Sequence, residues 1–200
     1  MGPVTIATAK GLFVARKSPL VGILASLVAA AFALIAFSGH PGAAAVVDGQ
    51  KIPERDISTA VSQWQPVVQQ QLTPATMLST VIRAPIVLEV AADHGISASE
   101  EDGAAYLDSL AEQSQIEPPE TYADITIEVA RMQMVLGTLN SGQVNTDGIA
   151  EELTERTNAL DVTVNPRYGE WDAQAASGGF IAPVTPDWLI APAADAPAVG

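Results

Sequence analysis

Side chains able to perform acid–base, nucleophilic or metal chemistry are scarce in this chain. It contains no Cys and two His residues, His40 and His94. His40 precedes Pro41 at the end of a long apolar run, and His94 stands at the expected end of a helix, where an imidazole favours the helix dipole. A nucleophile–base pair or a zinc site built on Cys and His therefore lacks its usual components. We predict that the protein is not an enzyme and that it binds no cofactor and no metal ion.

Two carboxylate clusters are the remaining candidates for chemistry. They are Glu100-Glu101-Asp102 and Glu151-Glu152, and each falls near the expected beginning of a helix. Negative charge in the first turn of a helix interacts favourably with the helix dipole. We therefore interpret both clusters as N-terminal helix charges rather than as calcium or acid–base sites.

Methionines on apolar helical faces indicate a binding function instead. The Met side chain is flexible and polarizable, which suits it to irregular apolar contacts. Met77 falls in the second predicted helix, and Met132 and Met134 fall in the fourth, which is the most apolar. We predict a peptide-binding groove, with core packing of the same side chains as the alternative. The groove residues are Met77, Val81, Met132, Met134 and Val135.

The N-terminal segment carries an export signal. Pro19–Phe37 is uncharged, and three basic residues precede it: Lys10, Arg16 and Lys17. This arrangement keeps the N-terminus in the cytoplasm and sends the following chain across the membrane. We expect residues 1–18 to be a cytoplasmic basic segment and residues 19–38 to be a transmembrane anchor or a signal peptide, with Ala43–Ala45 as the candidate cleavage site. The remainder would lie outside the cytoplasmic membrane, either anchored by a single pass or secreted.

The exported part is strongly acidic. All 23 Asp and Glu residues but only six of the nine Lys and Arg residues lie beyond the apolar run, which gives this part a net charge of −17. Such a surface repels nucleic acid and anionic lipid headgroups. We predict no nucleic-acid partner and interpret the acidic surface as a device for solubility.

Periodic apolar residues predict five helices within residues 45–172. Thr73-Pro74 resembles a helix start, Gly95 a helix end, and Ser97 with Glu100 a capping box. The predicted helices cover about 55–72, 74–94, a third that starts at Ser97–Asp102 and ends before Pro118, 120–140 and 146–159.

Two short β-type segments enclose these helices. Ala45–Ile52 precedes the first helix, and Asp161–Asp172 follows the last. Because neither is long enough to form a stable sheet alone, we predict that they pair and join the two ends of a helical domain. Residues 173–200 are rich in Ala, Pro and Gly, and we expect a mobile tail whose Trp188, Leu189 and Ile190 dock on a partner or on the chain's own helices.

Four motifs follow one another along the chain in an order that resembles a known family. Val46-Val47-Asp48-Gly49 with Ile52 comes after the export segment, and Leu-x-x-x-Ile covers Leu78–Ile82. Ala-x-x-x-Gly-Ile-x-x-Ser covers Ala91–Ser99, and Asn165–Asp172 closes the series. This order resembles the N-terminal chaperone domain of the SurA family and its relatives among PrsA-type foldases and trigger factor. The closing segment is similar to the end of a compact actinobacterial branch of that family.

The resemblance implies a mainly α domain over residues 45–172 that binds unfolded segments of exported polypeptides. Family members often carry a parvulin-type isomerase domain, for which this chain has no room after Asp172. We therefore expect an extracytoplasmic, ATP-independent, chaperone-like domain whose partners are unfolded or nascent exported polypeptides. The alternative is a non-catalytic accessory or scaffold subunit docked to a membrane protein complex.

Overall fold

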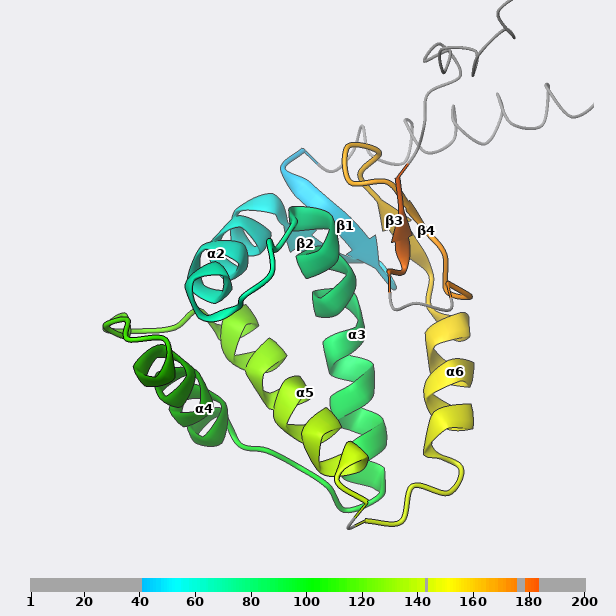
Figure 1. Cartoon of the computed structure of the whole chain (residues 1–200). Helices are drawn as coiled ribbons and strands as arrows, with labels where there is room; N and C mark the ends of the chain where they lie inside the picture. Colours follow the sequence, from blue (N-terminus) through cyan, green and yellow to red (C-terminus); the bar gives the residue numbers. More distant parts are fainter. Residues whose placement is uncertain (1–40, 143, 176–178, 184–200) are drawn as a thin grey trace, which may run out of the picture.

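The computed structural model describes residues 41–142, 144–175 and 179–183, and this part of the chain is mainly helical (Figure 1). The expected membrane helix or signal peptide, residues 19–38, lies outside the described residues. The same holds for Trp188, Leu189 and Ile190 of the expected docking tail.

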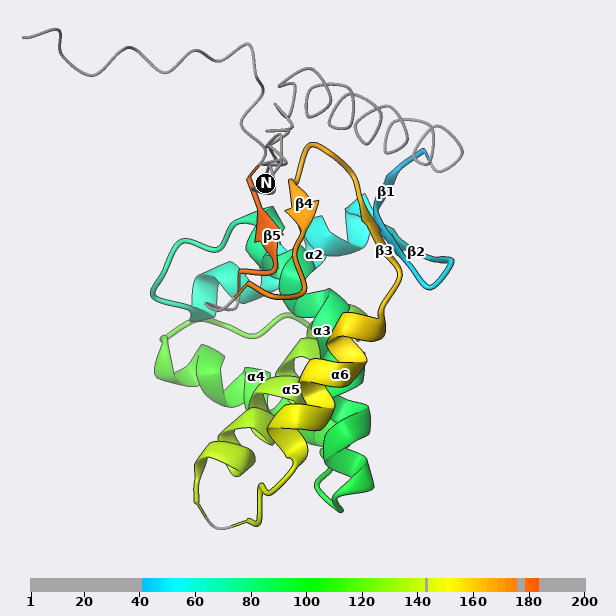
Figure 2. The ribbon, with the colours of Figure 1, turned by 90° about the vertical axis from the view of Figure 1, so that its right-hand side faces the viewer.

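The described residues form five α-helices, one 3-10 turn and five short strands. Most strands gather at one end of the helices (Figure 2). In chain order the elements are β1 (Ala43–Val47), β2 (Gln50–Pro53), α2 (Glu54–Trp64), η1 (Gln65–Val67), α3 (Pro74–Asp93), α4 (Glu100–Gln113), α5 (Asp124–Asn140), α6 (Ile149–Ala159), β3 (Val162–Val164), β4 (Glu170–Trp171) and β5 (Ile181–Ala182).

The two ends of the helical domain pair as predicted. β1 lies between β2 and β3 and is antiparallel to both. Val164 lies opposite Ala45, and Val162 lies opposite Val47. The strand before the helices therefore forms one sheet with the strand that follows them.

A single Asp-Gly turn explains much of this pairing. Asp48 and Gly49, with φ angles of 49° and 79°, both have the positive φ that a tight hairpin turn requires. The backbone N–H of Asp48 also donates to the carbonyl of Asp161 (2.9 Å), and the Asp161 N–H donates to Asp48 Oδ1 (3.0 Å). Asp48 thus forms the β1–β2 turn and fixes the beginning of β3.

Four of the helices lie side by side in the order α4, α5, α3, α6 (Figure 1). α3 is central: ten of its residues are buried, and it packs on α5 and α6. Judged by length and composition only, α3 is the one helix among the described residues that could span a membrane. It has 20 residues and a mean hydropathy of 1.5. Because 56% of that stretch is buried inside the domain, it serves here as the core helix.

Several helix boundaries differ from the prediction. The capping box at α4 consists of Ser99 and Asp102, not Ser97 and Glu100, because buried Ala98 holds the chain in the core before the helix begins. The first helix ends at Trp64 and continues as the 3-10 turn η1, which contains Pro66. The expected start of α3 at Thr73-Pro74 is confirmed, since Thr73 accepts a hydrogen bond from the Thr76 N–H (3.1 Å).

The ordered domain extends beyond Asp172, where the sequence predicted a mobile tail. β5 pairs with β4, Ile181 is buried, and Phe180 stacks on Trp171 with ring centroids 5.4 Å apart. At Gly169, a Cβ atom would collide with the Ala182 carbonyl, so glycine permits this close approach. Composition alone concealed the segment because its only apolar anchors, Phe180 and Ile181, are embedded among small residues.

Candidate functional site

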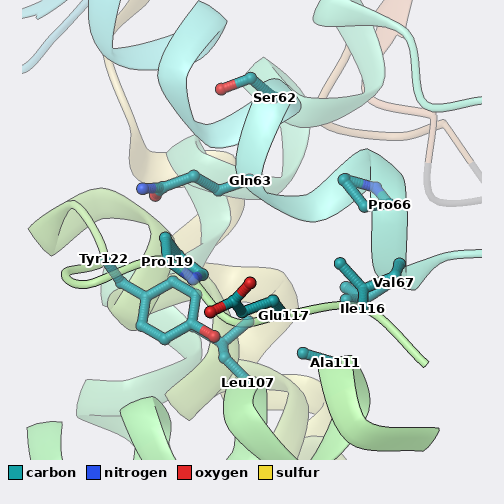
Figure 3. A pocket seen from close by; sticks show the side chains of 10 residues that line it. All are labelled: Ser62, Gln63, Pro66, Val67, Leu107, Ala111, Ile116, Glu117, Pro119 and Tyr122. Atoms are coloured by element: carbon teal, nitrogen blue, oxygen red, sulfur yellow. The ribbon is translucent and has the colours of Figure 1, made fainter. Parts of the chain in front are cut away.

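An apolar hollow lies between the end of α2, η1, α4 and the loop of residues 114–123 (Figure 3). We call it the α4 hollow, and its volume is about 230 Å³. Ile116, the one large apolar side chain classed as exposed among the described residues, lies at its wall with 37% of its surface exposed. The residues that line it include Gln63, Val67, Leu107, Ala111, Ile116, Glu117 and Tyr122.

Gln63 fixes the upper wall of the α4 hollow to the beginning of α5. Its Oε1 accepts hydrogen bonds from the Ala123 N–H (3.1 Å) and from Thr126 Oγ1 (2.7 Å). Its Nε2 donates to the Thr121 carbonyl (3.3 Å). Since Ala123 has no side chain able to cap α5, a residue about sixty positions earlier performs this role. Trp64 Nε1 adds a hydrogen bond to the Thr126 carbonyl (3.4 Å).

Tyr122 fixes the loop to α4. Its hydroxyl donates to Asp108 Oδ1 (3.0 Å). Burial, followed by this hydrogen bond and the charge of Asp108, raises the pKa of Tyr122 to about 12. The phenol therefore stays neutral at physiological pH and acts as a fixed part of the wall.

The packing of α4 on α5 depends on Gly103. A Cβ atom at this position would lie 2.9 Å from Arg131 Cγ and 3.1 Å from the Ile127 carbonyl oxygen. Arg131 in turn donates from Nε to the Ala98 carbonyl (2.8 Å), just before α4 begins. The N-terminal half of α4 is therefore close-packed, and the α4 hollow opens along its C-terminal half at Leu107 and Ala111.

A second hollow adjoins the first at η1. It has a volume of about 310 Å³, lies among α2, α3, α4 and α5, and shares Val67 with the α4 hollow. Tyr106 and Leu110 of α4 line it, whereas Leu107 and Ala111 of the same helix line the α4 hollow. Apolar surface is thus accessible from both flanks of the contact between η1 and α4.

The structure does not assemble the five predicted groove residues into one groove. Met77, Val81, Met132 and Val135 are at most 5% exposed, and Met134 is half-buried. Met77 and Val81 belong to one core cluster, whereas Met132 and Val135 form another with Met134 at its margin. Their helical spacing, which suggested a shared face, directs most of them into the core between α3 and α5.

Two of these five residues do reach a hollow. Met77 lines the hollow beside η1, and Val81 lines a separate one next to the β1–β2 hairpin. The α4 hollow contains neither. Its own residues escaped the sequence analysis because Ile116, Glu117 and Pro119 lie in a loop without periodicity. The pair of prolines with an isolated Ile in front of them was the available signal.

His94, which follows α3, has a structural partner on α6. Its Nε2 donates to Glu152 Oε2 (3.1 Å), and Glu152 Oε1 accepts from Arg156 Nη2 (2.6 Å). Arg156 also pairs with Glu89 (2.9 Å) and Asp93 (2.7 Å). We call these five residues the Arg156 cluster.

The Arg156 cluster joins α3 to α6 electrostatically. The hydrogen bonds from His94 and then Arg156 lower the pKa of Glu152. The hydrogen bond to Asp93, followed by that to Glu152, raises the pKa of Arg156. Within residues 41–142, 144–175 and 179–183, no group of three or more His, Asp or Glu side chains is arranged to hold a metal ion.

Comparisons of the chain with protein-family models, with curated proteins and with solved structures find no match. The resemblance to the SurA family therefore stays a prediction from the sequence motifs.

Proposed function

We propose that this protein is an extracytoplasmic, chaperone-like domain that binds apolar segments of exported polypeptides without ATP. The observation that carries the proposal is the α4 hollow, an apolar surface with Ile116 exposed at its wall. Apolar concave surfaces of this kind are the usual places where polypeptides bind. The SurA-like order of the motifs and the export segment ahead of the domain support the same function.

The charge around the hollow indicates what kind of segment it favours. Glu117 lines the hollow, and Asp108 lies beside it as the partner of Tyr122. No Lys or Arg is among the lining residues. An apolar segment flanked by Lys or Arg would therefore bury its apolar side chains and place its charges near these carboxylates. Such segments are preferred over acidic ones.

The walls of the hollow favour repeated, weak binding. Gln63 and Tyr122 hold two walls in place through hydrogen bonds, so the apolar surface is preformed. A volume of about 230 Å³ accommodates one or two side chains rather than a folded partner. The binding would delay aggregation without retaining the client, and the acidic exterior would keep the complex soluble.

The proposal is tested by aggregation of a denatured client protein. The exported part, added at stoichiometric amounts, should suppress light scattering. Ile116→Ser should weaken this suppression, because it removes the most exposed apolar contact of the hollow. Leu88→Ser is the matched control, since Leu88 is a half-buried apolar residue of α3 that lines none of the hollows described above.

Two outcomes would overturn the proposal. One is the absence of any suppression at several-fold excess of the domain. The other is an equal loss in both variants, which would assign the effect to stability rather than to the hollow. Crosslinking in intact cells provides the second measurement: many nascent exported proteins support the chaperone function, whereas one stoichiometric partner identifies an accessory subunit instead.

A further inference from the structure

A cavity with a mixed polar and apolar lining lies between α3, α6 and the segment before β5. We call it the Arg83 cavity, and its volume is about 470 Å³, the largest of the hollows described here. Arg83 of α3 lies at its wall, with its guanidinium carbon over the Phe180 ring, 4.4 Å from the ring centroid. Phe180 is held there by its stacking on Trp171.

Arg83 differs from the other arginines of the described residues in having neither an ion-pair partner nor a hydrogen-bond acceptor. Arg55, Arg156 and Arg167 each form an ion pair with Asp or Glu, and Arg131 donates to a backbone carbonyl. In the described part of the chain, Arg83 makes neither an ion pair nor a hydrogen bond. This is unusual in a chain with 23 acidic and nine basic residues.

The position of Arg83 makes this lack of a partner costly. Its side chain is half-buried, and burial lowers its pKa from the usual value. Contact with the face of an aromatic ring stabilises a guanidinium but does not use its N–H groups. The five N–H donors of Arg83 are therefore available to an anion, and a carboxylate matches their geometry best because it accepts two parallel hydrogen bonds.

Neutral polar side chains line the cavity together with the apolar Leu153, Ala173 and Ala175. Thr157 of α6 is only 7% exposed, and Asn158 follows it at the mouth with Gln174. None of these three side chains makes a hydrogen bond within the residues that the structure describes. Hydroxyl and carboxamide groups can donate to a carboxylate oxygen, and carboxamides can also pair with a peptide group.

From this arrangement we propose that the Arg83 cavity binds a peptide carboxylate. Arg83 forms a bidentate pair with the carboxylate, Thr157 donates to one of its oxygens, and Asn158 with Gln174 pairs with the adjoining peptide group. This site is separate from the α4 hollow, so the proposal does not rest on the chaperone function.

Two sources can supply the carboxylate. One is the carboxyl terminus of another polypeptide. The other is this chain itself, because Asp187 and Asp195 are its only side-chain carboxylates outside the described residues. Asp187 follows the described Pro183 by four positions. The chemistry at Arg83 is the same in both cases.

Peptide titration of the full-length chain in detergent micelles, followed by NMR, tests the proposal. The probes are acetyl-tetra-alanine with a free carboxyl terminus and the same peptide with a carboxamide terminus. The acid should bind about ten-fold more tightly or better, because only the acid forms the charged pair. Arg83→Gln should remove the preference, and Arg83→Lys should retain part of it. Arg55→Gln is the control, since this arginine is exposed and distant in sequence.

The two sources are separated by the double substitution Asp187→Asn with Asp195→Asn. If the chain's own carboxylate occupies the cavity, the preference for the acid peptide should be weak in the native chain and strong in this variant. If the cavity awaits an external terminus, the preference should be equal in both. Acid and amide peptides that bind alike in both chains would overturn the proposal. An amide spectrum of Arg83→Lys that matches the spectrum of the native chain shows that substitution at this position retains the fold.

Discussion

The outer helices α4 and α6 are attached to the central pair of α5 and α3 in different ways. α4 packs on α5 through a close backbone approach at Gly103 and through apolar side chains such as Leu107. α6 packs on α3 through Ile149 and through the charges of the Arg156 cluster. The first attachment leaves an apolar hollow beside it, and the second leaves a cavity with a more polar lining.

This difference separates two kinds of stability in one small domain. Apolar packing and neutral hydrogen bonds depend little on salt or on pH, whereas ion pairs at a solvated surface are screened by salt and lost when the carboxylates become protonated. We therefore expect substitutions on the α4 side to have larger effects that are insensitive to conditions. Substitutions on the α6 side should have smaller effects that depend on salt concentration and pH.

The largest effect is expected for Gln63→Ala. This change removes three hydrogen bonds and leaves the Ala123 N–H and the buried Thr126 hydroxyl without a partner. The free energy of unfolding should fall by about 2–3 kcal/mol, because unsatisfied buried polar groups are costly. Urea denaturation measures the loss. Gln133→Ala is the control on exposed α5 surface and should stay within about 0.5 kcal/mol of the native chain. Equal effects of the two substitutions would mean that the hydrogen bonds of Gln63 contribute nothing to stability.

The next prediction compares alanine substitutions at two helical glycines, whose effects on stability should have opposite signs. Gly103→Ala introduces a Cβ atom 3.1 Å from the Ile127 backbone oxygen, which cannot move aside easily. We expect a destabilisation of about 1–2 kcal/mol from overpacking, reduced by the better helix propensity of Ala. Gly137→Ala meets nothing within 4 Å and should stabilise the protein by about 0.5–1 kcal/mol. Thermal unfolding of the two variants decides whether α4 is close-packed at Gly103.

On the α6 side, Arg156→Gln should cause a smaller loss of stability, and this loss should decrease as the salt concentration rises. The change removes three ion pairs, each of them solvent-accessible. The melting temperature should decrease at low ionic strength, and the difference from the native chain should shrink when the salt is raised to about 1 M. Gly103→Ala should show the same difference at both salt concentrations. A salt-independent loss in Arg156→Gln would show that its aliphatic stem, rather than its charge, holds α6.

The smallest effects concern two carboxylates with opposite pKa shifts. Glu152 has a folded-state pKa lowered by His94 and Arg156, so its stabilisation is present above the unfolded pKa and lost as the pH falls through the folded pKa. Burial raises the pKa of Glu128 on α5, despite the nearby charge of Arg131. Its penalty is therefore present above the folded pKa and is relieved on acidification.

Unfolding measured from about pH 7 to about pH 3 separates these two groups. Glu152→Gln should flatten the loss of stability on acidification. Glu128→Gln should raise stability near neutral pH and make the acid decline steeper, because the opposing group is gone. Identical pH profiles of the two variants would contradict the assignment of opposite shifts.

Local signals in the sequence accounted for the outline of the fold. The Asp48-Gly49 turn, the Thr73-Pro74 start of α3 and the αL glycine at Gly95 each specify a backbone conformation with few alternatives. The pairing of β1 with β3 followed from the need of short strands for partners. Some boundaries were wrong because the deciding contact was distant, as at the beginning of α5, which Gln63 caps.

The candidate sites could not be predicted in the same way. Periodicity showed that Met77, Met132 and Met134 lie on apolar helical faces, but a face that packs in the core has the same period as one that lines a groove. Phe180 and Arg83 are almost a hundred positions apart, in segments whose compositions gave no reason to join them.

The sequence by itself determined the class of the fold, the turns and the scarcity of catalytic side chains, because these follow from residue types and short spacings. Only the tertiary structure decided which apolar side chains remain accessible beside α4 and which arginine lies half-buried without a partner. Accessibility and charge pairing depend on distances between segments remote in sequence, and no local pattern encodes those distances.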